Sequence, residues 1–195
     1  MPAAPTATSA LHGRRLLLGV SGSIAAYKSA LLVRLLVKAG AEVQVILTEA
    51  AAAFDTPLTL GTLSKKPVLT GFLRDAAAGE WHNHVELGLW AEAYIIAPAS
   101  ANTLAQLAHG FCPNLLSAVY LSARCPVFLA PAMDLDMFAH PAVTENLARL
   151  RSFGNHVLDS PSGELASGLA GPGRMLEPED IARALEEFFE LKMIN

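Results

Sequence analysis

Short apolar runs alternate with longer segments of helical periodicity along most of this chain. The first unit starts at Arg15 with an apolar run, turns at residues 19–23, and continues as a segment in which leucine recurs every three or four positions before Gly40. A second apolar run follows at residues 42–47. A strand, a helix and a strand within about 30 residues form a βαβ unit. Strands that are apolar throughout are typical of a parallel sheet covered on both faces.

The same alternation continues to the end of the chain and predicts an α/β protein. We predict further strands at residues 68–70, 93–97, 126–130 and 156–158. We predict further helices at residues 49–54, 57–63, 82–90, 104–109, 114–122, 142–152 and 179–192.

Two segments carry turn chemistry instead of a periodic pattern. Residues 72–81 contain Gly79 and a run of alanines, and we expect an irregular, mobile flap there. Residues 160–175 hold four glycines and two prolines, which predicts a loop without regular structure. A loop of that length in a compact domain is usually functional or disordered.

Length and charge narrow the class of protein. The chain has 195 residues, which suits one domain with a full hydrophobic core. We assign residues 14–195 to that domain and residues 1–13, which are rich in Ala, Pro, Thr and Ser, to a disordered tail. The net charge of −4 and the lack of a basic run argue against a nucleic-acid-binding surface.

Other compositional features concern membranes, metals and compartment. No apolar run reaches the roughly 18 residues that a membrane span requires, so we predict no membrane association. The two cysteines, Cys112 and Cys125, are too few for a disulfide framework or a zinc site, so we predict no metal. Reduced thiols are typical of the cytoplasm, where we expect this protein to act.

The turn at residues 19–23 is the first candidate for chemistry. Gly22 permits close approach of the backbone, and the hydroxyls of Ser21 and Ser23 can cap the first N–H groups of the next helix. Free N–H groups at the positive end of a helix dipole form an anion site that suits a phosphate. The spacing matches neither G-x-G-x-x-G nor a Walker loop, so a mononucleotide fits better than a dinucleotide. A plain strand-to-helix turn without a ligand is the alternative.

Small polar side chains also follow other predicted strands, at the sheet edge where ligands bind in open α/β folds. Thr48 follows the second strand, and Ser100, Asn102 and Thr103 follow the strand at residues 93–97. Each can contact a phosphate, a ribityl chain or a ring edge, or can cap the helix that comes next.

Three further segments offer acid–base, sulfur or ionic groups. His84 is a candidate general base, with a surface histidine bonded to a neighbour as the alternative. Met133 and Met137 flank acidic residues after a predicted strand, where core filling explains methionines as well as ligand contact does. Arg174 can neutralise an acidic substrate.

Four sequence blocks occur in order along the chain. They are residues 19–28 (GVSGSIAAYK), 98–103 (PASANT), 131–133 (PAM) and 171–175 (GPGRM), with His84 in a His-Val-Glu-Leu context. Together they resemble the homo-oligomeric flavin-containing cysteine decarboxylases. Within that family the resemblance is to the phosphopantothenoylcysteine decarboxylases, the amino-terminal part of a bifunctional bacterial coenzyme A biosynthesis protein. It covers residues 16–186.

The resemblance implies a Rossmann-like, flavodoxin-type three-layer fold with a central parallel sheet and bound FMN. It also implies a homotrimer or a dodecamer, with the flavin at a subunit interface. The implied substrate is a small phosphorylated cysteine conjugate, 4′-phosphopantothenoylcysteine. In the implied reaction the flavin oxidises the thiol, carbon dioxide leaves, and the resulting ene-thiol is reduced to 4′-phosphopantetheine.

Position by position, the resemblance also implies roles for single residues. It makes His84 the active-site base and places Asp134 and Met137 at the substrate carboxylate, while Arg174 is our candidate for a second substrate contact. The residues implied to hold FMN are Gly22, Ser23, Ile24, Thr48, Ser100, Ala101, Asn102, Thr103 and Ala132.

The chain departs from the family pattern at two positions. Asp134 replaces an asparagine, whose amide can donate hydrogen bonds to a carboxylate that an ionised aspartate repels. Ser167 replaces a cysteine of the mobile flap, and a serine hydroxyl is a far weaker acid than a thiol. We therefore expect oxidative decarboxylation to persist, while the final proton delivery is slow or falls to another group. Cys112 is a candidate for that group, with a buried structural thiol as the alternative.

Two other functions stay open. A peptidyl-cysteine oxidative decarboxylase would also lack the flap cysteine, but it would need a peptide groove and no cation for a phosphate. A flavin-binding regulatory subunit is the non-enzymatic alternative, although such relatives carry long acidic tails that this sequence lacks.

Overall fold

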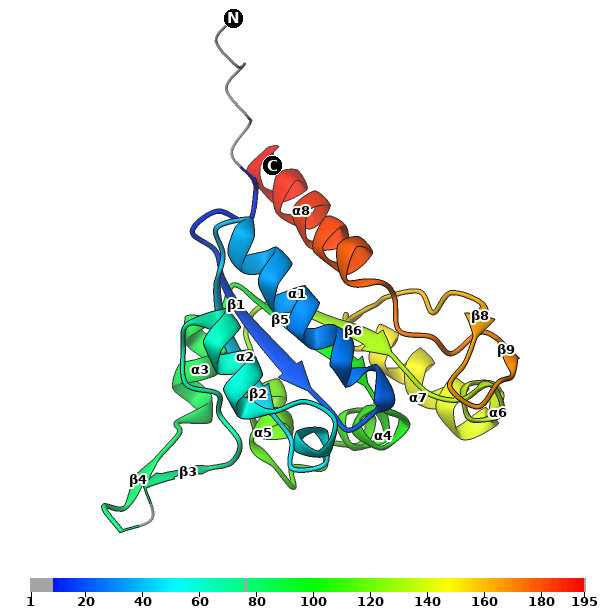
Figure 1. Cartoon of the computed structure of the whole chain (residues 1–195), viewed down its shortest axis with the longest axis horizontal. Helices are drawn as coiled ribbons and strands as arrows, with labels where there is room; N and C mark the ends of the chain where they lie inside the picture. The colour runs from blue at the N-terminus through cyan, green and yellow to red at the C-terminus, as the bar shows by residue number, and fades with distance from the viewer. Residues whose placement is uncertain (1–8, 76, 195) are drawn as a thin grey trace, which may run out of the picture.

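A computed structural model describes residues 9–75 and 77–194 of the chain. Its centre is a parallel sheet with the strand order β2-β1-β5-β6-β7 (Figure 1). The strands are β1 (Arg15–Val20), β2 (Glu42–Leu47), β5 (Ala93–Ala99), β6 (Val127–Pro131) and β7 (His156–Val157). Counted along the sheet, this is the flavodoxin-like order 2-1-3-4-5. The flavodoxin-type three-layer fold that the resemblance implies is therefore confirmed.

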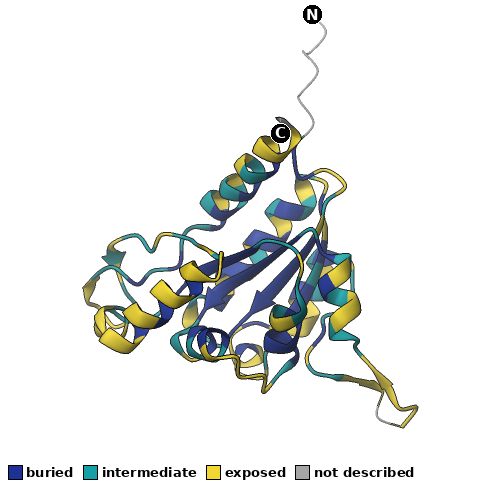
Figure 2. Cartoon of the chain, turned by 180° about the vertical axis from the view of Figure 1, so that it is seen from behind, coloured by how far each residue is buried: buried dark blue, intermediate teal, exposed yellow. Residues whose placement is uncertain are grey.

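Helices cover both faces of the sheet. One face packs against α1 (Tyr27–Lys38), α2 (Pro57–Ser64) and α8 (Pro178–Ile194). The other packs against α3 (His84–Trp90), α4 (Ala101–His109), α5 (Leu115–Ser122) and α7 (Pro141–Ser152). In β1, Leu16 and Leu18 join the first core cluster and Leu17 joins the second. Because both faces are covered, the strands are buried, and the helices expose their outer sides (Figure 2).

Two short hairpins differ from the sequence-based expectation. Residues 72–81, expected to be irregular, form β3 (Leu73–Asp75) and β4 (Glu80–Trp81), which project from the rest of the protein (Figure 1). Residues 160–175, expected to lack regular structure, contain β8 (Gly163–Glu164) and β9 (Ala170–Gly171). Strands of two or three residues are too short to show an alternating pattern, so periodicity did not indicate them.

Other short elements also differ from expectation. The helix predicted at residues 49–54 is one 3₁₀ turn, η2 (Ala51–Ala53), and a second 3₁₀ turn, η1 (Ile24–Ala26), precedes α1. The strand predicted at residues 68–70 is reduced to a single bridge between Leu69 and Ile46. Helix α6 (Leu135–Ala139) was not predicted, because five residues are too few to establish a helical period.

The predicted tail, residues 1–13, is wrong at its inner boundary. Residues 1–8 lie outside the described residues. In the part that follows, Leu11 is fully buried in the main core cluster, and Ser9 Oγ donates a hydrogen bond of 2.6 Å to Glu186 Oε1 in α8. The tail prediction relied on the composition of the first ten residues and did not weigh the apolar area that Leu11 buries.

Candidate functional site

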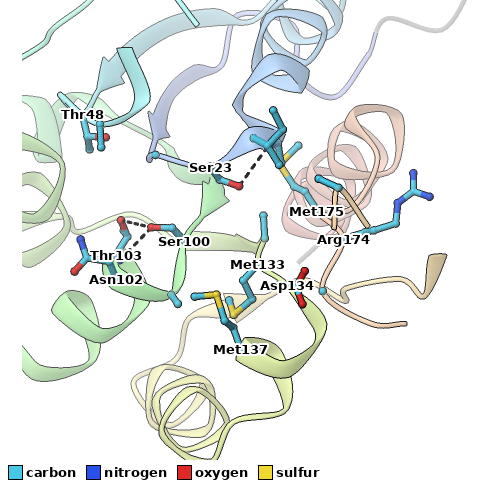
Figure 3. Close-up of a pocket in the computed structure, with 18 of the residues that line it drawn as sticks. Ser23, Thr48, Ser100, Asn102, Thr103, Met133, Asp134, Met137, Arg174 and Met175 are labelled. Carbon is cyan, nitrogen blue, oxygen red and sulfur yellow. Dashed lines mark hydrogen bonds between the residues drawn. The ribbon is translucent and has the colours of Figure 1, made fainter. Parts of the chain in front are cut away.

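A cavity of about 990 Å³ lies at the carboxyl-terminal edge of the sheet. Its walls are the β1–α1 turn, the segment after β2, the start of α4, the β6–α6 loop and the β8–β9 loop (Figure 3). We define the β8–β9 loop as residues 160–175. The sheet order reverses between β1 and β5, and such a switch point is where open α/β sheets bind ligands.

The β1–α1 turn is fastened to the neighbouring strand by a buried serine. Ser21 Oγ donates to the Pro98 carbonyl at 2.7 Å and accepts from the Ser100 N–H at 2.9 Å. In the same turn Gly22 approaches the segment after β2, since a Cβ added there would lie 2.6 Å from the Ala50 Cβ. A larger residue would push these two walls of the cavity apart.

The start of α4 provides hydroxyls and free N–H groups. Ser100 Oγ accepts from the Thr103 N–H at 3.3 Å and donates to Thr103 Oγ1 at 3.2 Å. The Ala101 and Asn102 N–H groups lie at the positive end of this helix of nine residues. On the neighbouring walls, Ser23 likewise caps its own helical turn. These serines therefore act as caps at the cavity edge, and the helix terminus suits an anion.

The β6–α6 loop contributes sulfur and a carboxylate. Met133, Asp134 and Met137 all line the cavity (Figure 3). Asp134 stands at the N-cap of α6, yet its side chain makes no capping hydrogen bond. Its carboxylate is therefore not used by the helix and can meet a ligand.

Two cations at the cavity wall share one carboxylate. Lys28 Nζ lies 2.7 Å from Glu177 Oε1, and Arg174 Nη2 lies 2.9 Å from the same oxygen. The hydrogen bond from Lys28 is the main cause that holds the pKa of Glu177 below its ordinary value, and the positive charge of Arg174 adds to it. In Figure 3 the guanidinium of Arg174 points away from Asp134. Its Nη2 donates to Glu177.

Most of the predicted site residues meet at this cavity. The predicted residues that line it are Gly22, Ser23, Ile24, Thr48, Ser100, Ala101, Asn102, Thr103, Ala132, Asp134, Met137 and Arg174. The side chains Lys28, Glu49, Gln106, Asn114 and Glu164 also line it and were not predicted. Lys28 had one usable signal, a lysine in the apolar stretch that opens α1, whose buried charge requires a partner.

Two predicted catalytic residues do not line the cavity. His84 is the first residue of α3, which lies at the opposite end of the molecule from the β8–β9 hairpin (Figure 1). Its Nδ1 is buried and has no hydrogen-bond partner among the described residues, and its ring lies 5.8 Å from that of Trp81. Ser167 is exposed near the tip of the β8–β9 loop, although its neighbour Ala166 lines the cavity.

The structure also bears on the candidate thiol and on metals and membranes. Cys112 is exposed and does not line the cavity, although the next residue, Pro113, does. The alternative of a buried structural thiol is therefore wrong for Cys112. Within residues 9–75 and 77–194, no group of three or more His, Cys, Asp or Glu side chains could hold a metal ion. No helix in that part of the chain is long and apolar enough to cross a bilayer.

Known proteins resemble this chain along most of its length. It is 42% identical over 185 residues to the coenzyme A biosynthesis bifunctional protein CoaBC of Vibrio parahaemolyticus, covering 95% of this chain and 46% of that protein. It is 58% identical over 140 residues to a cysteine/cysteine sulfinic acid decarboxylase of an unknown prokaryotic organism, covering 72% of this chain and 39% of that protein. The chain thus spans less than half the length of these curated relatives.

Solved structures share the fold. A cysteine-to-serine mutant of a PPC decarboxylase, complexed with pantothenoylaminoethenethiol, is 33% identical, with a TM-score of 0.81 over 92% of this chain and 100% of that one. The FMN-dependent cysteine decarboxylase SpaF is 31% identical, with a TM-score of 0.73 over 91% of this chain and 98% of that one. The Flavoprotein family matches residues 5–190. Since that match covers nearly the whole sequence, the chain belongs to the Flavoprotein family.

Proposed function

We propose that this chain binds FMN and decarboxylates 4′-phosphopantothenoylcysteine, a step of coenzyme A biosynthesis. The observation that carries the proposal is that all nine residues assigned to FMN from the sequence line one cavity, together with Asp134 and Met137. A cysteine decarboxylase with FMN and a PPC decarboxylase are among the solved structures that share this fold. A cytoplasmic enzyme of that pathway also fits two free cysteines.

The cavity residues fit a flavin mononucleotide. The β1–α1 turn, expected from the sequence to bind a phosphate, and the start of α4, with the hydroxyls of Ser100 and Thr103, would together hold the phosphate. The start of α4 combines free N–H groups with a positive dipole. The volume of about 990 Å³ lies at the upper end of the roughly 300–1,000 Å³ typical of small-molecule sites. That leaves room for a substrate beside the cofactor.

Bound FMN would supply a two-electron oxidation of the substrate thiol and the return of those electrons to the decarboxylated product. The chain's own residues would orient the substrate and move its protons. Asp134 at the N-cap of α6 and Met137 within that helix line the cavity and would contact the cysteine end of the substrate. Removal of the thiol proton needs a base, and we assign that role to His84.

We propose that His84 reaches the cavity of a second copy of the chain in a homotrimer or dodecamer. Two exposed apolar surfaces support this proposal. One, Val85 and Leu89, adjoins His84 on α3, and the other, Ile24 and Tyr27, adjoins the cavity. A contact between two different surfaces repeats head to tail, and it closes into a ring such as a trimer when the rotation between neighbours allows it.

Mixed oligomers test this assignment of His84. His84→Asn removes the base, and Ala101→Glu places a carboxylate in the proposed phosphate site at a helix position that favours acids. We expect each variant alone to be inactive. Subunits mixed at random should recover about a quarter of the wild-type turnover, because a quarter of the sites pair an intact cavity with an intact His84. No recovery in oligomers shown to be mixed would contradict a shared site.

We propose that Ser167 makes the reductive half of the reaction slow. Oxidative decarboxylation does not require the Ser167 hydroxyl, but the ene-thiol must receive a proton from an acid when it is reduced. A serine hydroxyl is a far weaker acid than the thiol that the family pattern has there. Each FMN would then yield one equivalent of the ene-thiol, two hydrogen atoms lighter than 4′-phosphopantetheine, and dioxygen would have to take the two electrons left on the flavin before the next turnover.

One experiment tests the main proposal directly. The purified protein should be yellow, bind FMN in a fluorescence titration, and release carbon dioxide from 4′-phosphopantothenoylcysteine. Mass spectrometry of the product then separates the ene-thiol from the saturated thiol. A colourless protein that does not bind added FMN would refute the cofactor assignment, and a flavoprotein inactive on this substrate would refute the substrate assignment.

Free cysteine or cysteine sulfinic acid is a second candidate substrate. The 58% identical relative carries those names. Asp134 offers this candidate a structural reason, because a carboxylate that its own helix does not use can pair with the α-ammonium group of a free amino acid. Competition between free cysteine and the phosphorylated conjugate for one enzyme sample would decide between the two.

A further inference from the structure

The β8–β9 loop forms one wall of the cavity, and its ends are joined to each other and to the β6–α6 loop. Glu164, Leu165 and Ala166 line the cavity. At the base of the loop, Ser160 Oγ donates to the Arg174 carbonyl at 2.6 Å, and the Met133 N–H donates to the Gly173 carbonyl at 3.0 Å. These bonds hold the base. They do not determine how far the hairpin leans over the cavity.

The Arg174 side chain connects the hairpin to the start of α8. Gly163 of β8 lies directly against it, since a Cβ added to Gly163 would be 2.7 Å from Arg174 Nη1. On its other side the guanidinium donates to Glu177 Oε1 at 2.9 Å. The position of β8 is therefore coupled to the position of Glu177.

Glu177 in turn is bound to the opposite wall. Lys28 belongs to the first turn of α1, its side chain is 10% exposed, and it donates to the same Glu177 oxygen at 2.7 Å. A buried ammonium that loses its carboxylate partner is strongly disfavoured. This bond is therefore hard to break, although Glu177 itself is 41% exposed.

We propose that Glu177 is a positioning residue that, through Lys28 and Arg174, clasps the β8–β9 loop over the substrate end of the cavity. We call these three residues the clasp. Arg174 links β8 to Glu177, and Glu177 is bound to Lys28 of α1. No other ion pair among the described residues joins the loop to α1. The clasp fixes the wall that carries Glu164 to Ala166, and with it the start of the tip that carries Ser167. Its effect on turnover rests on the function proposed above.

Three variants and a control test the clasp. Glu177→Gln removes the shared charge, Lys28→Met detaches α1 and leaves the Arg174 pair, and the double variant removes both. Asp180→Asn is the control, because it breaks an exposed ion pair with Arg183 on the same helix. If the three residues act as a unit, the double variant should raise amide exchange of the loop and KM no more than Glu177→Gln alone does.

Amide hydrogen exchange measures how often the β8–β9 loop opens, independently of enzyme activity. We expect amides of residues 163–171 to exchange at least about fivefold faster in Glu177→Gln and Lys28→Met, and unchanged in Asp180→Asn. Exchange that stays at the wild-type rate in either clasp variant would overturn the proposal. So would an equal rise at residues 93–99 in the central strand, because that would indicate general destabilisation.

Kinetics and cofactor binding complete the test. We expect KM for 4′-phosphopantothenoylcysteine to rise about five- to tenfold in the clasp variants, with kcat and the FMN dissociation constant within about twofold of wild type. A loss of FMN affinity without a change in KM would show that Lys28 serves the cofactor and would overturn the clasp. If the wild type turns over no such substrate, the proposed function fails, and the exchange data alone decide on the clasp.

Discussion

Replacing Ser21 by alanine should loosen the junction on which the cavity is built. Its hydroxyl is buried and bridges the ends of β1 and β5, donating to the Pro98 carbonyl at 2.7 Å and accepting from the Ser100 N–H at 2.9 Å. After the substitution Pro98 keeps the bond from the Ser21 N–H at 3.3 Å, but the Ser100 N–H loses its acceptor.

The expected loss of stability follows from these two bonds. A hydrogen bond contributes about 1 kcal/mol, and a buried donor left without an acceptor costs about 1–3 kcal/mol. Because the bond from the Ser100 N–H is only part-buried, the variant should lose about 2 kcal/mol, at the lower end of the sum. Because Ser100 caps α4, the start of that helix should also shift, and FMN affinity should fall about tenfold or more.

Urea unfolding of the FMN-free protein, with and without added FMN, separates the two effects, since FMN adds its own stabilisation by mass action. Ser29→Ala is a matched control, because this buried serine makes one bond, to the Ala97 carbonyl at 3.0 Å, and leaves no N–H without an acceptor. It should cost about 1 kcal/mol. A Ser21→Ala variant that loses no more than Ser29→Ala would refute the bridging role.

Three other predictions concern single residues. The pKa of Glu177 is lowered mainly by its bond with Lys28. The stabilisation from the ionised Glu177 should therefore be complete above the ordinary glutamate pKa of about 4.3 and disappear as the pH falls through the lowered pKa. The difference in Tm between wild type and Glu177→Gln should shrink over that pH range. Ser167→Cys should convert the ene-thiol product to 4′-phosphopantetheine, seen as a gain of two hydrogen atoms in the product mass. Asp134→Asn should raise kcat/KM for the phosphorylated conjugate about tenfold, about 1.4 kcal/mol, by removing a charge that repels its carboxylate, and an unchanged value would exclude that repulsion.

The sheet and its cofactor edge could be predicted because both depend on local signals. The run at residues 42–47 matches β2 residue for residue, and Gly40 ends α1 with a φ of +90°. The chain also places the polar residues after each strand at one sheet edge, since parallel strands all end there. Ser100 illustrates why two interpretations stayed open, because it both caps α4 and lines the cavity.

The clasp could not be predicted because Lys28 is far in sequence from Arg174 and Glu177. Lys28 and Glu177 are brought together when α8 packs beside α1, and no periodicity records that contact. The sequence suggested that Arg174 would neutralise a substrate, but its guanidinium is already paired with Glu177. A charge on a loop says little about its partner until the fold places one beside it.

His84 shows a further limit of prediction from the sequence, because the role proposed for it requires a second copy of the chain. His84 does not line the cavity of its own chain. Its Nδ1 is nevertheless buried without a hydrogen-bond partner among the described residues, and a buried polar atom without a partner is energetically costly. Neighbouring apolar side chains, Val85 and Leu89, are also exposed. A second copy packed against α3, as proposed above, would account for both facts. An isolated chain would then hold the whole cofactor cavity and lack the base, so turnover should fall on dilution before FMN dissociates.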